Sequence, residues 1–200
     1  MKRYIKTAAI AILISQSLSA EVIFDIGDQQ LSESVNQTYK DATYETDNVL
    51  INTGLAYIDG AYSPKLLKSG HYGVKIKEPK DNWSVTFAMK CYTVNSGCGV
   101  TLNGANGKAI SMEFDIDQIN VDGNSTKDSS LSSSSTSNCE TYINASVEKV
   151  QNGVEVVING KHKYIINKKD FKLGQIDISI NSDGNGATDE LTSLSISTSN

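Results

Sequence analysis

Short runs in which apolar and polar residues alternate are the feature that most limits what this chain can fold into. The clearest run is WSVTFAMKC, and its apolar positions all fall on one side of an extended chain: Trp83, Val85, Phe87, Met89 and Cys91. Successive side chains of a β-strand point to opposite faces, so this pattern predicts a half-buried strand. AISMEFDID and the stretch from Ile176 to Ile180 repeat it, and no long stretch shows a helical period. The sequence therefore predicts an all-β fold.

Turn signals between these runs indicate how the strands are connected. Asn152-Gly153 and Asn159-Gly160 each separate two β-prone runs, and Asn-Gly is the favoured pair for a two-residue hairpin turn. Residues from about Tyr142 to Ile166 are thus predicted to form a three-stranded meander. Further strands are expected at Val22 to Ile26, Val49 to Asn52, Tyr72 to Lys77, Gly99 to Asn103 and Leu191 to Ser197. Half-buried strands in this number require two facing sheets or a barrel, and we favour a two-sheet antiparallel sandwich.

The first twenty residues have the pattern of a secretory signal peptide. Lys2, Arg3 and Lys6 precede the apolar run AAIAILI and a stretch of small residues, with cleavage expected after Ala20 or Ser19. We therefore expect a secreted protein that is periplasmic, surface-attached or extracellular. Removal of those three residues takes the formal charge from −5 to −8, because all 23 acidic residues lie later in the chain. This charge disfavours a nucleic-acid partner, and no later segment is apolar enough to predict a membrane span.

The remaining residues, 21–200, are expected to form a single domain. Their number suits one β-sandwich, and no internal repeat is visible. Within them, residues 123–138 are serine-rich with Leu131 as their single apolar residue. Such a stretch gains too little from burial to offset the entropy of ordering, so we expect a mobile loop between strands.

Three cysteines follow the signal segment, and an oxidising compartment favours pairing two of them. Cys91 and Cys98 flank the turn-like stretch YTVNSG, so a disulfide that clamps a hairpin or loop there is the first expectation. Cys139 is then left over as a buried or idle thiol. Pairing of Cys139 with Cys98, or with another chain, stays open.

From Leu67 to its end, the chain resembles the concanavalin A-like (LamG-like) jelly-roll superfamily. The segments that carry the resemblance are SGHYGVKIKEPKDNWSVTFAMKC, GVTLNGANGKAISMEFDID, VEKVQNGVEVVINGKHKYI and DELTSLSIS. The resemblance implies that the first and last strands lie side by side, which would pair Val22 to Ile26 with Leu191 to Ser197. The family's tryptophan-histidine pair before the meander is replaced here by residues 139–142. Residues 27–65 match no part of the family pattern.

Three alternating carboxylates, Glu113, Asp115 and Asp117, form the most pointed candidate site. One continuous strand would project them from one face at about 7 Å spacing. The motif E-F-D-I-D resembles the E-x-D-x-E strand of a glycoside hydrolase family on the same jelly roll. That resemblance implies Glu113 as nucleophile, Asp115 as its helper and Asp117 as the acid, with an Asp where the family has Glu. The alternative is a solvated strand face that binds a ligand or none.

The stretch from Asn181 to Glu190 is a candidate calcium loop. Its oxygen ligands stand at spaced positions with glycines between them: Asn181, Asp183, Asn185 and Asp189. It resembles the start of an EF-hand loop but has Thr192 where that loop has its bidentate Glu. An ordinary Asp/Asn/Gly-rich turn is the alternative.

Other residue types point to no catalytic set. His71 and His162 have no partner at a catalytic spacing, and His162 is expected to face solvent. The lysines from Lys161 to Lys172 form a basic patch, expected to serve solubility or to meet an anionic glycan. Nucleophile-elbow, P-loop and dinucleotide fingerprints are all missing from the sequence.

The expected function is a secreted binding or adhesion module that recognises a glycan or an extracellular surface protein, with Ca²⁺ as a candidate ion. This expectation follows from the resemblance. Two alternatives remain: a glycan-cleaving enzyme that uses Glu113 and Asp117, and a structural surface or matrix component.

Overall fold

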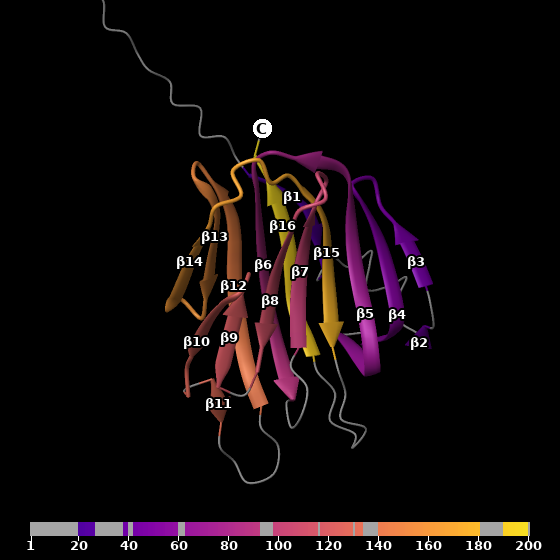
Figure 1. Cartoon of the computed structure of the whole chain (residues 1–200). Helices are drawn as coiled ribbons and strands as arrows, with labels where there is room; N and C mark the ends of the chain where they lie inside the picture. The colour runs from indigo at the N-terminus through magenta and orange to yellow at the C-terminus, as the bar shows by residue number, and fades with distance from the viewer. Residues whose placement is uncertain are drawn as a thin grey trace, which may run out of the picture.

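The computed structural model describes residues 20–26, 38–39, 42–59, 63–92, 98–115, 117–129, 131–133, 140–180 and 190–199, and Figure 1 shows their arrangement. Every regular element in these ranges is a β-strand, and all strand pairs are antiparallel. Within them, no helix is long and apolar enough to cross a membrane. The predicted all-β class and two-sheet antiparallel sandwich are confirmed.

The first sheet runs in the order β10-β9-β8-β7-β15-β5-β4, with β3 and β2 on the far side of β4. Its strands, in that order, are Asn124–Lys127, Gln118–Val121, Ala109–Phe114, Cys98–Gly104, Leu173–Ile180, Ser63–Lys80, Val49–Asp59, Ala42–Glu45 and Thr38–Tyr39. The strands β2 to β4 occupy the stretch that the family pattern left unassigned, and they form one edge of this sheet.

The second sheet runs in the order β14-β13-β12-β6-β16-β1. Its strands, in that order, are His162–Ile166, Gly153–Ile158, Glu140–Val150, Trp83–Tyr92, Glu190–Thr198 and Glu21–Asp25, and the short β11 (Ser132–Ser133) pairs with the start of β12. The long strand β5 joins the two sheets, because Lys65 pairs with Glu190 of β16 while residues 70–75 pair with β15. The first and last strands, β1 and β16, lie side by side as the resemblance implied.

Inward-facing side chains of the two sheets form one core. The alternation predicted for β6 is confirmed, because the residues between its predicted inward positions are more exposed and the inward residues themselves are buried: Trp83, Val85, Phe87, Met89 and Cys91. Phe87 of the second sheet faces Phe114 of the first with ring centroids 6.4 Å apart. Ile116 and the side chain of Ile180 lie outside the described residues.

The predicted meander is present as β12, β13 and β14, with its two turns built differently. Asn159 and Gly160 have φ angles of 52° and 65°, the left-handed pair that a primed hairpin turn needs. At the other turn Gln151 and Asn152 form the loop and Gly153 already pairs with Val150. A Cβ at Gly153 would lie 2.0 Å from the carbonyl oxygen of Ile166, so glycine is required there by close approach.

The serine-rich segment contains strands, which corrects the expectation of one loop over residues 123–138. An Asp122-Gly123 turn with φ angles of 49° and 84° starts it, and Asn124–Lys127 then pairs with β9. The chain next crosses to the second sheet, where Ser132–Ser133 pairs with β12. The prediction missed these strands because it weighed only apolar content. The Asp122-Gly123 turn and the buried side chain of Leu131 order the crossing. Residues 134–139, and with them Cys139, lie outside the described ranges.

A buried carboxylate holds this crossing against the second sheet. Asp128, with 7% of its side chain exposed, accepts from Lys161 at 2.9 Å and lies 2.5 Å from Nε2 of His162. His162 is itself 12% exposed, so the expectation that it faces solvent is wrong. A charge this deep costs free energy unless it is paired, which explains why both partners converge on it.

The predicted Cys91–Cys98 disulfide is present, but it does more than clamp a hairpin. Cys91 ends the buried row of β6 in the second sheet, and Cys98 starts β7 in the first. The bridge therefore links the two sheets through the core, and closing so short a loop contributes about 2.5 kcal/mol in the chain-entropy model.

The histidine of the Asp128 cluster is open to a direct test. We expect His162→Ala to lower the free energy of unfolding by about 1–3 kcal/mol, because the nearly buried Asp128 carboxylate would lose one of the partners that offset its desolvation. Lys163→Ala on the same strand removes an exposed pair with Glu155 and should cost less than about 1 kcal/mol. Chemical denaturation of both variants measures the difference, and equal losses would contradict the role given to His162.

Candidate functional site

A hollow of about 480 Å³ opens on the outward face of the first sheet. Its walls come from β7, β8, β9, β15 and the turn after β8, with these lining residues: Cys98, Gly99, Thr101, Ser111, Met112, Glu113, Phe114, Asp115, Gln118, Asn120 and Ser179. The outward positions of these strands are polar, whereas their inward neighbours belong to the core. The outward side chains of these strands therefore form the site, and their inward side chains form the core.

The strand register explains why the sheet is hollowed at this place. Ser179, Gly99, Glu113 and Asn120 stand opposite one another across β15, β7, β8 and β9. Gly99 contributes no side chain to the middle of this row, so the longer side chain of Glu113 stands beside a gap. A Cβ at Gly99 would already lie 3.3 Å from the carbonyl oxygen of Met112.

Amide side chains fix the borders of the hollow. On the β15 side, Asp177 accepts from Asn103 at 2.5 Å and from Gln175 at 2.7 Å. On the β9 side, Gln118 donates to Ser125 at 2.6 Å, and the side-chain oxygen of Asn120 accepts from the backbone of Gly123 at 3.1 Å. Side chains held in this way present hydrogen-bonding groups with little further loss of entropy on binding.

The three predicted carboxylates do not share one strand, which corrects the geometry expected for them. β8 ends at Phe114, and the backbone N–H of Asp115 donates to the carbonyl of Gln118 at 2.9 Å as the chain turns into β9. Glu113 and Asp115 line the hollow, whereas Asp117 does not. The chain therefore reverses between β8 and β9, where the motif suggested a continuous strand. The nucleophile, helper and acid assigned by resemblance are therefore not aligned on one strand face.

Residues 181–189, which hold the candidate calcium ligands, and the side chain of His71 lie outside the described residues. In the ranges that the structure does describe, no cluster of three or more His, Cys, Asp or Glu side chains is placed to hold a metal.

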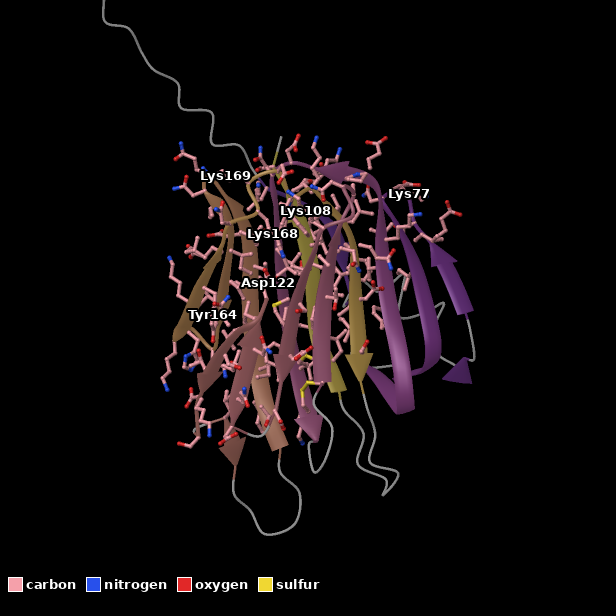
Figure 2. All side chains as sticks on the ribbon, viewed as in Figure 1. Lys77, Lys108, Asp122, Tyr164, Lys168 and Lys169 are labelled. Carbon is pink, nitrogen blue, oxygen red and sulfur yellow. A yellow bond between two sulfur atoms is a disulfide. The ribbon has the colours of Figure 1, made fainter. Side chains whose placement is uncertain are left out.

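The basic patch is largely neutralised by ion pairs. Four of the five lysines from Lys161 to Lys172 contact carboxylates, with partners Asp128, Glu155, Asp122 and Asp81. Figure 2 shows Lys168, Lys169 and Lys108 gathered near one end of the molecule. There, the hydrogen bond from Lys108 is the main cause that lowers the pKa of the Asp170 carboxyl. These pairs tie the β14–β15 connection to its neighbours, so the expected glycan-binding role of the patch has little support.

Sequence reasoning found Glu113 and Asp115 but missed most of the hollow. Its remaining polar lining comes from single serine, threonine and amide residues at outward strand positions, such as Ser111 and Thr101. The alternation marked Ser111 as outward, yet nothing in one strand's sequence indicates which other strands lie beside it.

No protein-family model matches the sequence, and no curated protein matches it. Several solved structures match in fold. The sialidase of Trypanosoma rangeli is 7% identical with a TM-score of 0.50, and the match covers 81% of this chain and 29% of the sialidase. The β-glucanase of Bacillus licheniformis is 13% identical with a TM-score of 0.48, covering 82% and 100%. A tetrameric galectin from the ball sponge Cinachyrella is 15% identical with a TM-score of 0.45, covering 63% and 98%. At such identities the likeness is one of fold.

Substitutions in β8 should separate the hollow from the core. We expect Glu113→Gln to change the free energy of unfolding by less than about 0.5 kcal/mol, because its side chain is exposed. Phe114→Ala, one residue later, should cost about 3–5 kcal/mol because it empties a fully buried position. Urea titration measures both, and a large loss for Glu113→Gln would mean that Glu113 serves the fold.

Proposed function

We propose that this chain, which has the concanavalin A-like jelly-roll fold, is a secreted glycan-binding module. The observation that carries the proposal is the hollow on the first sheet, where hydroxyl, amide and carboxylate groups from four strands converge. These are the groups that hydrogen-bond to sugar hydroxyls. Secretion rests on the signal-like residues 1–20.

The charge of the hollow favours a neutral glycan. Glu113 and Asp115 line it, and no lysine or arginine is among its described lining residues. Two carboxylates accept hydrogen bonds from sugar hydroxyls but repel sulfates and uronates. The formal charge of −5 for the whole chain acts in the same direction.

A glycan-cleaving enzyme is the second candidate, supported by the position of Glu113 in the hollow. A retaining enzyme needs two carboxyl groups about 5–5.5 Å apart on either side of the bond that breaks. Asp117 is not among the lining residues of the hollow. The catalytic pair of such an enzyme would therefore be Glu113 and Asp115. Binding needs no such pair, which is why we place it first.

The proposal includes a calcium ion bound by the candidate loop after β15. The candidate loop starts at Asn181, two positions after Ser179, which lines the hollow. An ion bound by that loop would fix the chain that leads directly out of the site. Millimolar calcium outside cells is sufficient for a weak loop of this kind.

The binding proposal is tested with a broad glycan array and two matched variants. We expect the purified protein to bind one class of neutral glycan, and Glu113→Gln to weaken that binding about tenfold or more through a lost charge-assisted hydrogen bond. Asp117→Asn removes the same charge outside the hollow and should leave affinity unchanged. Release of shorter sugars from the bound glycan would favour the enzyme instead, and a blank array would favour a protein partner or a structural role.

The calcium proposal needs a separate measurement. We expect a chelator to lower both the thermal midpoint and the glycan affinity, and added Ca²⁺ to restore them, because an ion that binds only the folded state stabilises it. Asp183→Asn should abolish the response to Ca²⁺. Identical midpoints and affinities in chelator and in Ca²⁺ would refute the ion and leave glycan binding untouched.

A further inference from the structure

We propose a second saccharide site on the opposite side of the sandwich, in a groove on the outward face of the second sheet beside Tyr142. It lies over β16, β6, β12 and β13 and shares no residue with the hollow on the first sheet. Its evidence is independent of the proposed function, although the class of ligand is the same.

The groove has a volume of about 320 Å³. Its lining residues are Thr86, Phe87, Ala88, Asn144, Ala145, Ser146, Val157, Gly160 and Ser193. The strand register sets Ser193, Ala88 and Asn144 in one row across the sheet, and Ser195, Thr86 and Ser146 in the next. Small side chains at the centre of these rows, such as Ala88 and Ser146, keep the floor of the groove low.

The chemistry of the lining selects an uncharged, hydroxyl-bearing ligand. Hydroxyl groups of Thr86, Ser146 and Ser193 and the amide of Asn144 can donate and accept hydrogen bonds. None of the described lining residues carries a formal charge. A cationic ligand would therefore lose its hydration without gaining a counter-charge, whereas a neutral sugar exchanges its bonds to water for bonds to these groups.

Tyr142 is not among the lining residues, but the strand register places this aromatic residue in the next row, opposite Lys90. It precedes Asn144 by two residues on β12, so both side chains leave the same outward face. Half of Tyr142 is exposed (50%), whereas most large apolar residues of the described chain are buried. The apolar C–H face of a sugar ring packs against such a ring, and its hydroxyls then reach the polar groups next to it.

The backbone under Tyr142 is held on both sides. The side chain of Asn159 donates to the carbonyl of Tyr142 at 3.1 Å, and its oxygen accepts from the N–H of Asn144 at 2.7 Å. The Lys90 ammonium lies 5.4 Å from the centroid of the Tyr142 ring. The two hydrogen bonds hold the strand under Tyr142 and the ammonium contact orients its ring, which reduces the entropy lost on binding.

Two sites on opposite faces would let one molecule bind two glycan chains at the same time. A glycan bound over β8 and another bound over β12 lie on outward faces of different sheets, so neither blocks the other. One protein can then link two glycan chains, and retention on a polymer with many copies of the sugar rises by avidity. This consequence rests on the proposed function as well as on the second site.

The test is an amide-resolved NMR titration of the purified protein with neutral hexasaccharides of β-1,3-, β-1,4- and α-1,4-linked glucose. We expect at least one of them to shift the amides of Thr86, Ala88, Ser146 and Ser193. Tyr142→Ala should lower the affinity measured from these shifts about tenfold or more, because the sugar would lose its aromatic surface, whereas Tyr142→Phe keeps the ring and should retain binding.

Two controls separate the possible failures. Ile165→Ala removes another exposed side chain on the same sheet (55% exposed) outside the groove and should leave binding unchanged. Glu113→Gln should weaken only shifts in the first sheet. Shifts confined to the first sheet would overturn the second site and leave the proposed function standing. Shifts confined to the second sheet would overturn the hollow as a glycan site and leave the second site standing. Equal binding by Tyr142→Ala and the parent protein would overturn the inference.

Discussion

The structure depends on burial of the inward side chains of its central strands between two sheets. Phe87, Val85 and Met89 of the second sheet and Phe114, Met112 and Val100 of the first are all at most 2% exposed. Because side chains alternate along a strand, committing these positions to the core commits their neighbours to solvent. The core therefore determines which residues are available for binding, and it leaves two outward faces on opposite sides of the molecule.

A sandwich of this kind has an open side between its outermost strands, and here ion pairs close it. Asp128, on the crossing from β10 to β11, is held by the turn and strand that contain Lys161 and His162. Lys168, after β14, contacts Asp122 in the β9–β10 turn at 2.7 Å with both side chains about three-quarters covered. Both contacts join the edge of the first sheet to the edge of the second, and Figure 2 labels Asp122 and Lys168 of the second contact. Partly buried pairs of this type gain specificity from geometry more than they gain net stability, so they fix how the edges meet.

Local pattern was enough to predict the strands but not how far each one extends or what lies beside it. The alternation of β6 and the Asn159-Gly160 turn could be identified from the sequence because each is a property of a few adjacent residues. Asp117 was misplaced because a turn stabilised by one backbone hydrogen bond leaves no apolar signature. His162 was misplaced because its partner Asp128 is distant in sequence. The hollow depends on Gly99 standing beside Glu113, a neighbour relation that the sheet register alone creates.

The two outward faces differ in how their depressions are formed. On the first sheet, the hollow exists because Gly99 omits a side chain, and carboxylates surround it. On the second sheet, the groove exists because serine and alanine are short, and no charge lines its described part. A face that served only to keep the protein soluble would favour long charged side chains, which fill such depressions and cover apolar surface. Short hydroxyl side chains beside an exposed Tyr142 instead leave both space and hydrogen-bonding groups available, which is the arrangement that a bound sugar needs.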